Sequence, residues 1–383
     1  MQVDPANSAN SPSKKLTTGS TTCDYVQVED PAVTESLPLV SPPSPSASRA
    51  ASLPGVIAGT MHHQGNFTGD VTDSVLTAVS MQPGSVIADR YEIVDELGRG
   101  GMGIVYKATD KKDNNKFVAL KILNNPGSGQ VNEKLLYRFI REGKAHQGLK
   151  HPHILECFDF NPQYPYLAME LLEGGSLKSP VTNLSLEQRI LIMADICDAL
   201  QYAHQNTLIH RDVKPGNILL GTELTSDDYL QRPVAKLADF GLVLIPDATR
   251  VTRTGDLTGS AIYMSPEQAG GKRQHLSGVS DLYSIGIILY EIVSGKVPFD
   301  GGGSGELLAI LQQHQSATPI PLSELKPEIS NTNLPPGLEP IIMTLLKKDP
   351  AHRYYTQASD LASDLRNIVK PKKAKTKLKP PPV

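Results

Sequence analysis

The sequence contains no tryptophan and only three cysteines, Cys23, Cys157 and Cys197. An odd, sparse set of cysteines without a C-x-x-C spacing argues against a disulfide framework and a zinc site, and it fits a reducing compartment. Long apolar runs are also missing: residues 282–290 form the most apolar stretch, Glu291 ends it, and nine residues are too few to span a bilayer. Because the N-terminus also lacks the basic and apolar regions of a signal peptide, we expect a cytoplasmic protein.

Neither sign of charge dominates the chain as a whole. The 37 Lys and Arg residues stand against 40 Asp and Glu residues, and the formal net charge of −3 predicts no general attraction to nucleic acid. The exception is residues 370–383, which contain six Lys, four Pro and no acidic residue. We expect a flexible tail there. Weak peripheral contact with anionic lipid or acidic partners is one interpretation, and a solubilising tail is the simpler one.

The N-terminal part has few residues that could build a core. Residues 1–85 contain 22 Ser and Thr, nine Pro and only two aromatic residues, Tyr25 and Phe67. Such a segment cannot bury enough apolar area to offset the entropy of ordering it. We therefore expect residues 1–88 to be disordered, with a docking or phosphorylated regulatory arm as the alternative.

The composition changes at residue 89. Three segments within residues 91–123 alternate apolar and polar residues or are rich in β-branched ones, which predicts an antiparallel meander. Leu135, Leu136, Phe139 and Ile140 recur at helical spacing with charges opposite them, which predicts a helix. Two more strands are expected over 154–160 and 164–173.

The pattern becomes helical after Gly174 and Gly175. Ser185 is a candidate N-cap for the first of these helices. The expected helices span residues 185–205, 281–295, 338–349 and 356–369. The fold class is thus α+β, with a small antiparallel β-rich lobe over 89–172 and a larger, mainly helical lobe over 173–369.

A glycine-rich turn lies between the first two predicted strands. Gly98, Gly100 and Gly103 form a G-x-G-x-x-G pattern, which lets a backbone approach phosphate oxygens closely. The same spacing opens dinucleotide-binding Rossmann units, but there it leads into a helix, whereas Val105 and Tyr106 here continue a strand. An ordinary glycine hairpin remains the alternative.

A lysine in the third strand is a candidate ligand for an anion. Lys121 ends the run "VALK", and its apolar neighbours predict that its side chain needs an anionic partner. Glu142, on the following helix, can supply a carboxylate and hold Lys121 against the oxygens of a nucleotide. A surface salt bridge is the competing interpretation.

The stretch "IHRDVKPGNILL", residues 209–220, places five polar or charged residues between apolar ones. Unpaired buried charges are costly, so these residues need partners. Together with "GRGGMGIV", "VALK", "DFG", "SPE" and "SDLYSIG", all in the family's order, this stretch resembles the eukaryotic-type protein kinases, most closely the Ser/Thr kinases of bacteria. The resemblance covers residues 91–369 and implies the bilobal protein-kinase fold.

The resemblance implies a phosphoryl transferase that uses ATP and Mg²⁺ on protein hydroxyls. Asp212 matches the catalytic Asp, and Lys214 would face the γ-phosphate. Asn217 and Asp239 would hold Mg²⁺, which prefers few carboxylates plus phosphate oxygens. Lys at the position of Lys214 favours Ser/Thr over Tyr specificity. Lys121 and Glu142 complete the catalytic set.

The nucleotide pocket can be carried over from the family one position at a time. In the family, the residues above and below adenine and the gatekeeper residue are apolar, and the hinge contacts adenine through its backbone. Plain core packing is the alternative interpretation for the apolar residues. The matched residues are Leu97, Gly98, Arg99, Gly100, Gly101, Met102, Gly103, Val105, Ala119, Lys121, Met169, Glu170, Leu172 and Leu219.

Three other matches are expected to be structural. Asp281 resembles the central-helix Asp that binds the backbone of the catalytic loop. Glu267 and Arg353 resemble a buried ion pair that braces the larger lobe.

The sequence departs from the family at three places, none of which removes an essential residue. Residues 223–233, "ELTSDDYLQRP", look like a surface insertion. Ser265 replaces the commoner Ala of the motif that ends the activation segment, and Ser260 stands where many relatives have Thr.

The family also implies regulation by phosphate. Arg211, directly before Asp212, is the residue with which relatives bind a phosphorylated loop, and "VTRT" resembles their double-Thr activation site. We expect autophosphorylation at Thr252 and Thr254 in a transient homodimer. The alternatives for the whole chain are a pseudokinase or scaffold, which the presence of all the catalytic residues disfavours, and a small-molecule kinase.

Overall fold

A computed structural model describes residues 81–100, 103–123, 133–179, 183–226, 230–240, 259–303, 306–325 and 334–370. Most of the N-terminal segment, the Lys-rich tail after residue 370, Gly101, Met102, Thr252 and Thr254 lie outside the described residues. The expectations for them therefore stay predictions.

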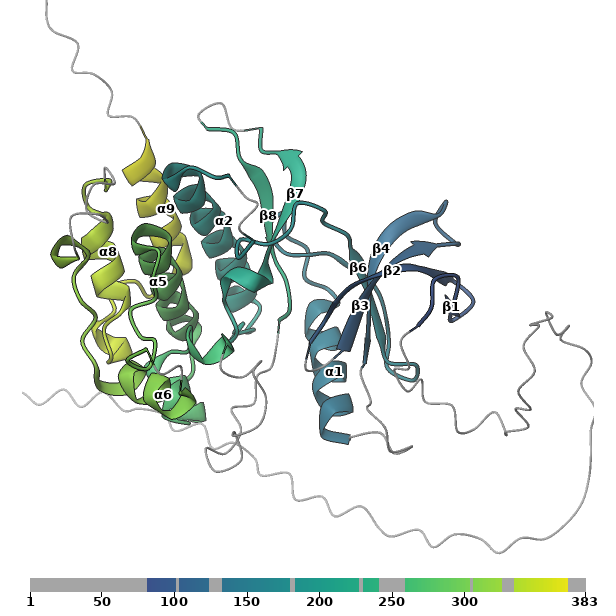
Figure 1. Ribbon diagram of the computed structural model, residues 1–383, viewed down its shortest axis with the longest axis horizontal. Helices are drawn as coiled ribbons and strands as arrows, with labels where there is room; N and C mark the ends of the chain where they lie inside the picture. The colour runs from purple at the N-terminus through teal and green to yellow at the C-terminus, as the bar shows by residue number, and fades with distance from the viewer. Residues whose placement is uncertain are drawn as a thin grey trace, which may run out of the picture. The chain divides into compact units, whose positions relative to one another are not determined.

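The smaller lobe is built on one antiparallel sheet with the strand order β1-β2-β3-β4-β6-β5 (Figure 1). The meander predicted over 91–123 is confirmed as β2, β3 and β4. Alternation along β3 buries Ile104 and Tyr106, which pack with Tyr91 and Leu120 into a core on one face of the sheet. The strands are β1 (Val86–Ile87), β2 (Tyr91–Arg99), β3 (Gly103–Asp110), β4 (Lys116–Leu123), β5 (Cys157–Asn161) and β6 (Tyr166–Glu170).

The sheet begins earlier than the sequence predicts. Strand β1 pairs with the start of β2, and Ile87, opposite Tyr91, is only 4% exposed. The backbone N–H of Met81 donates to the hydroxyl of Tyr106 at 3.1 Å. The expectation of disorder up to residue 88 is therefore wrong for residues 81–88. The sequence did not indicate β1, because a strand of two residues is too short to show a hydrophobic period.

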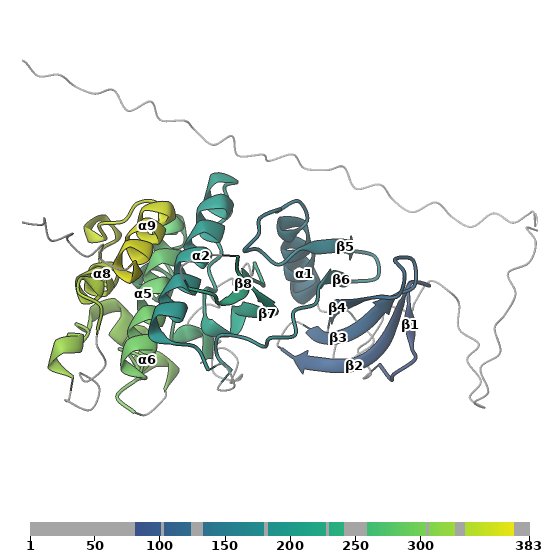
Figure 2. The ribbon, with the colours of Figure 1, turned by 90° about the horizontal axis from the view of Figure 1, so that it is seen from above.

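Helix α1 (Glu133–His146) packs beside β5 (Figure 2). The predicted apolar side is confirmed for Leu135, Leu136 and Phe139, which belong to one cluster with residues of β4 and β6, whereas Ile140 is not part of that cluster. A Cβ at Gly143 would lie 2.3 Å from the ring of Phe160. This glycine therefore allows the close approach of helix and strand that places Glu142 next to β4.

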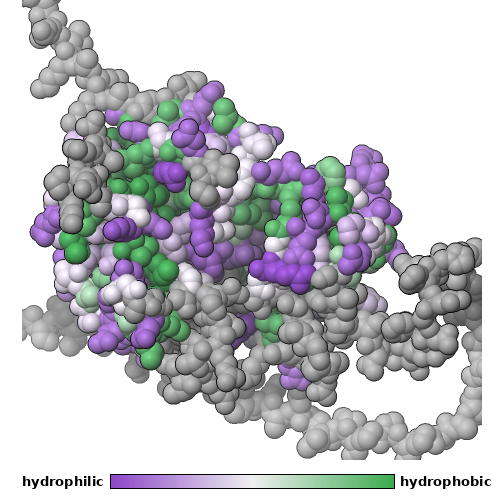
Figure 3. Space-filling view, in the orientation of Figure 1, coloured by the Kyte–Doolittle hydropathy of each residue, from purple (hydrophilic) through white to green (hydrophobic). Residues whose placement is uncertain are grey.

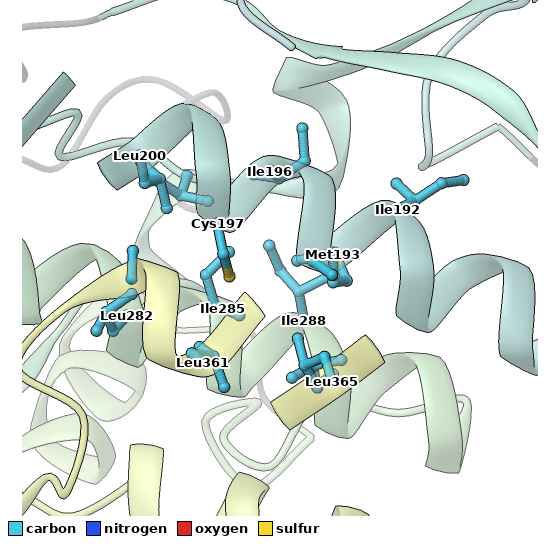
Figure 4. Packing of buried hydrophobic residues seen from close by; sticks show 14 of the residues in the cluster. Ile192, Met193, Ile196, Cys197, Leu200, Leu282, Ile285, Ile288, Leu361 and Leu365 are labelled. Atoms are coloured by element: carbon cyan, nitrogen blue, oxygen red, sulfur yellow. The ribbon is translucent and has the colours of Figure 1, made fainter. Parts of the chain in front are cut away.

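The larger lobe has an apolar core around helix α5, whose residues are almost all buried. Figure 4 shows side chains of α2, α5 and α9 meeting there, among them Met193, Ile285 and Leu361. The helices are α2 (Leu186–Gln205), α4 (Pro266–Ala269), α5 (Gly278–Ser294), α6 (Leu307–Ser316), α8 (Leu338–Leu345) and α9 (Ala358–Val369). The four predicted helices are confirmed, while α4 and α6 were not predicted.

Short elements complete this lobe. The predicted cap of α2 is confirmed, because Ser185 and Gln188 form a reciprocal capping box. In the described part of the lobe, 3₁₀ turns and a hairpin connect the helices: η1 (Pro215–Asn217), η3 (Arg273–His275), η4 (Leu322–Glu324), η5 (Pro350–His352), β7 (Ile218–Leu224) and β8 (Pro233–Leu237).

The expected surface insertion over residues 223–233 is anchored at its C-terminal end. Arg232 is only 3% exposed, and its guanidinium donates twice to the carboxylate of Asp195 in α2, at 2.9 Å each. Gln188 also donates to the carbonyl of Gln231 at 2.7 Å. The C-terminal end of the insertion is thus fastened to α2.

Polar and apolar residues are interspersed over the face seen in Figure 3. None of the helices within the described ranges is long and apolar enough to cross a membrane.

Candidate active site

The loop between α2 and β7 is held by its backbone. The carboxylate of Asp281 accepts the N–H of His210 at 2.9 Å and the N–H of Arg211 at 2.8 Å, so the role predicted for Asp281 is confirmed. Arg211 has a φ of 68°, a left-handed conformation that is strained for a residue other than glycine. The helix carboxylate therefore stabilises a backbone conformation that the loop would not adopt alone.

The polar side chains of this loop converge on Asp212. Lys214 Nζ donates to Asp212 Oδ2 at 2.7 Å and to Ser260 Oγ at 2.8 Å. The amide of Asn217, which is 6% exposed, donates to the carbonyl of Asp212 at 2.8 Å and to its Oδ2 at 3.1 Å. One carboxylate oxygen of Asp212, Oδ2, is thus held by two donors, which fix the orientation of the carboxylate.

Contacts between aromatic rings also support the loop. His210 donates through Nε2–H to the carbonyl of Ala238 at 3.0 Å, and its ring lies 4.7 Å from that of Phe240. The ring of Phe240 also lies 5.5 Å from that of His146 in α1. Burial lowers the pKa of His210, so the ring stays neutral and acts as a packing and hydrogen-bonding group.

Lys121 lies between two carboxylates contributed by different parts of the chain. Its Nζ is 2.6 Å from Glu142 Oε1 and 3.0 Å from Asp239 Oδ1. Burial opposes the charge of Lys121, but Asp239 and Glu142 outweigh burial and raise its pKa above the ordinary value. The charge of Lys121 in turn lowers the pKa of Asp239, whereas burial raises that of Glu142. The predicted Lys121–Glu142 pair is therefore formed, and Asp239 joins it.

The glycine-rich turn contains glycines of two kinds. A Cβ at Gly103 would lie 2.5 Å from the carbonyl oxygen of Ile122, so β4 itself requires glycine there. A Cβ at Gly98 would meet nothing within 4 Å, and one at Gly100 only an atom at 4.0 Å. Neither has a positive φ. The protein's own packing explains Gly103 but not the other two, which fits a turn that leaves room for a phosphate chain.

Most predicted apolar pocket residues come together from both lobes. The strand register places Ala119 opposite Met169 and Lys121 opposite Val105, on the neighbouring strands β3, β4 and β6 in the interior of the sheet. Val105, Ala119, Met169, Leu172 and Leu219 belong to a single cluster.

Two predicted pocket residues behave differently. Leu97 is 50% exposed and lies outside that cluster. The side chain of Glu170 forms an ion pair at 2.7 Å with Lys236 of β8, which the sequence did not indicate. The end of β6 is thus joined to β8 through Glu170. The segment that follows β6 is also joined to β7 through its backbone, where the N–H of Gly174 donates to the carbonyl of Leu220 at 2.9 Å.

The donor set suits Mg²⁺ only together with a phosphate ligand. The described parts of the chain contain no group of three or more His, Cys, Asp or Glu side chains that could hold a metal ion by themselves. Asp239 offers one carboxylate and Asn217 one amide oxygen. Mg²⁺ commonly takes one or two such protein ligands plus phosphate oxygens and water, so these residues fit it.

The remaining structural expectations are also met. Arg353 and Glu267, which are 2% and 4% exposed, form a two-pronged ion pair at 2.8 and 2.9 Å. Ser265 caps the short helix α4 through a capping box with Gln268. A serine at this position therefore has a local role that alanine could not fill.

The protein kinase domain model matches residues 91–362. The chain belongs to the protein kinase family. Curated relatives of this kinase domain include a probable serine/threonine-protein kinase of Clostridium perfringens, 37% identical over 75% of this chain, and PrkC of Bacillus subtilis, 35% identical over 74%. The chain spans about two fifths of the length of these curated relatives, 39% and 41%.

Solved kinase structures show the same fold. The kinase domain of PknI from Mycobacterium tuberculosis aligns over 76% of this chain and 100% of its own length, with a TM-score of 0.53 and 26% identity. The α+β, two-lobed protein-kinase fold expected from the motifs is confirmed.

Proposed function

We propose that the protein is a Ser/Thr protein kinase that transfers the γ-phosphate of ATP to protein hydroxyls. The observation that carries this proposal is the pair of charge clusters: Asp212 held by Lys214 and Asn217, and Lys121 held between Glu142 and Asp239. Both clusters are formed, whereas a pseudokinase or scaffold would need neither. The curated relatives, which are named Ser/Thr kinases, support the same function.

The residues divide the work between positioning and proton transfer. ATP would supply the phosphoryl group, and Mg²⁺, held by Asp239 and Asn217, would neutralise charge on its phosphates. Lys121 would bind phosphate oxygens, and Glu142 keeps its ammonium in place. Asp212 would accept the proton of the attacking hydroxyl, with the carboxylate oriented by Lys214 and Asn217. Ser260 in turn fixes Lys214, at 2.8 Å.

The direct test is a phosphorylation assay with the full chain, ATP, Mg²⁺ and a general protein substrate, with phosphosites mapped by mass spectrometry. Asp212→Asn should lower the transfer rate by about 10²-fold or more, because it removes the proton acceptor and keeps the shape. ATP binding should persist. Transfer by Asp212→Asn at the wild-type rate would refute the assignment.

The proposal extends to control by the activation segment. Arg211 Nε is buried and has no hydrogen-bond partner within the described residues. A phosphate group on the segment would give this cation a strong bidentate partner and order the segment. We expect autophosphorylation of Thr252 and Thr254 between two molecules, with rising activity.

Replacing both Thr252 and Thr254 by Ala should reduce peptide phosphorylation and leave ATP binding nearly intact. A double change of Thr249 and Thr258 in the same segment is the matched control and should behave like wild type. Full activity of the first double variant would exclude this form of control.

The proposed partners are Ser/Thr-containing proteins and, transiently, a second copy of the chain in the cytoplasm. The Lys-rich tail adds a candidate contact with anionic lipid, worth about 1 kcal/mol per Lys near such a surface. Sedimentation with phosphatidylserine vesicles, with and without residues 371–383, tests this contact. Equal sedimentation would leave the tail a solubilising segment.

A further inference from the structure

The strained residue before Asp212 is held from both sides. This residue is Arg211, and its N–H donates to the carboxylate of Asp281 at 2.8 Å, as described above. Its carbonyl accepts a hydrogen bond of 2.7 Å from Nε2 of Gln268, a residue of α4 that lies 57 positions further along the chain. Because Arg211 precedes Asp212 directly, the orientation of this backbone unit sets the direction in which the carboxylate of Asp212 leaves the loop.

The amide of Gln268 can adopt only one orientation in this site. Its Oε1 accepts the backbone N–H of Ser265 at 2.9 Å, and that partner can only donate. Its Nε2 faces the carbonyl of Arg211, which can only accept. Gln268 is 2% exposed, so no water competes for either bond. Both hydrogen bonds therefore need the full amide, and no shorter or singly polar side chain can replace it.

Helix α4 provides a firm base for this contact. The neighbouring Glu267 is fixed by Arg353 and by the hydroxyl of Ser280, which donates at 2.6 Å. The backbone carbonyl of Gln268 accepts the backbone N–H of Gly271 at 3.0 Å. The backbone of Gln268 is thus fixed independently of its side chain, so loss of the side-chain amide need not unfold the helix.

We propose that Gln268 is a positioning residue for phosphoryl transfer: by donating to the carbonyl of Arg211 it keeps the strained unit, and hence Asp212, in the orientation that accepts the substrate proton. The inference rests on the proposed kinase function. Gln268 lies behind the loop and touches no reacting atom, so its effect acts through Asp212 alone. It should therefore alter turnover and spare the binding of ATP.

The test compares three single variants of the full chain. Gln268→Met keeps the length and removes both hydrogen bonds, and Gln268→Glu keeps the acceptor for Ser265 N–H but loses the donor to Arg211. Ser265→Ala is the matched control, because it removes the hydroxyl cap and retains the backbone N–H that Gln268 uses. Initial rates give kcat and KM for ATP, and thermal unfolding gives stability.

Both Gln268 variants should lower kcat by about 10-fold to 100-fold, as expected for a misplaced catalytic group, with KM for ATP within about twofold of wild type. Ser265→Ala should lower the unfolding temperature but leave kcat close to wild type, since it loses only a helix cap. Wild-type kcat in both Gln268 variants, or a loss in them that merely matches that of Ser265→Ala, would overturn the proposal.

Hydrogen exchange provides a second measurement that does not depend on activity. The peptide covering residues 209–213 should exchange faster in Gln268→Met than in wild type. Once the carbonyl of Arg211 has lost its hydrogen bond from Gln268, the residue is held only through its N–H, and that N–H should open to solvent more often. Unchanged exchange there would also overturn the proposal. An inactive wild-type protein would instead refute the kinase function, and the exchange result would still decide whether Gln268 holds the loop.

Discussion

At the scale of single residues, the charge of Lys121 depends on a precise balance with its carboxylates. Lys121→Met should lower phosphoryl transfer by about 10²-fold or more, because the cation that would bind phosphate oxygens is lost. The fold should survive, since burial already raises the pKa of Glu142 and the unpaired carboxyl can take up a proton. Initial rates and thermal unfolding measure both effects.

Lys144, an exposed residue of the same helix as Glu142, offers a control. Lys144→Met removes a lysine of equal size without touching the cluster and should leave the rate unchanged. If Lys121→Met worked at the rate of Lys144→Met, the cluster would have no part in transfer.

The ion pair between Arg353 and Glu267 should be among the most costly to break. Arg353→Met should reduce the free energy of unfolding by about 3–5 kcal/mol, because it leaves the buried carboxylate of Glu267 without its cation. Urea denaturation measures the change. Lys111→Met breaks the exposed pair with Glu92 and should cost less than about 1 kcal/mol. If the two variants lost similar free energies of unfolding, the burial of the Arg353–Glu267 pair would add nothing to the cost of breaking it.

Sequence reasoning located the chemical groups but not all of their supports. Asp212, Asn217 and Asp239 could be found because their motifs occur in a recognisable order. Gln268 was missed, although "SPEQ" carries the spacing of a capping box that could have indicated it. Its contact with Arg211 joins residues that are distant in the chain, and no local pattern encodes such a contact.

At the scale of elements, length decided what could be predicted. The strands β2 to β4 are long enough to show a period of two, α2 is long enough to show a helical period, and α5 is long enough to show a continuous apolar character. The two residues of β1 show neither. The anchoring of the insertion between β7 and β8 could not be predicted, because the burial of Arg232 depends on Asp195, which lies 37 positions earlier.

Strand β1 supplies a prediction at this scale. A chain that starts at Met81 should unfold at the same urea concentration as the full chain and keep basal activity. A chain that starts at Asp89 loses the buried Ile87 and the contact of Met81 with Tyr106, and should be less stable by about 1.5–3 kcal/mol from the apolar area alone. Equal stability of the two shortened chains would place the boundary at residue 89 after all.

At the scale of the whole molecule, buried neutral histidines make stability depend on pH. Burial lowers the pKa of His146 from 6.5 to about 4, and its Nε2–H donates to the carbonyl of Leu155 at 2.6 Å. The unfolded chain binds this proton more readily than the folded one. The stability that the neutral ring of His146 contributes is therefore complete above pH 6.5, and it is lost as the pH falls from there towards 4.

The wild type should lose up to about 1.4 kcal/mol per pH unit through His146 within that window. His146→Gln keeps a donor for the carbonyl of Leu155 and cannot be protonated, so its stability should fall less steeply with acid. Urea denaturation at pH 7, 6 and 5 compares the slopes. Parallel slopes would mean that His146 is protonated in the folded protein.

The packing of α9 against α2 has a consequence for folding during synthesis on the ribosome. Leu361 and Leu365 complete the layer over Met193 and Cys197, and Arg366 reaches back to Asp195, 171 residues earlier. A nascent chain must therefore emerge from the ribosome almost to residue 369 before α9 can cover its share of α2. Until then that apolar part of α2 faces water, which makes this interval the one in which the growing chain most needs a chaperone.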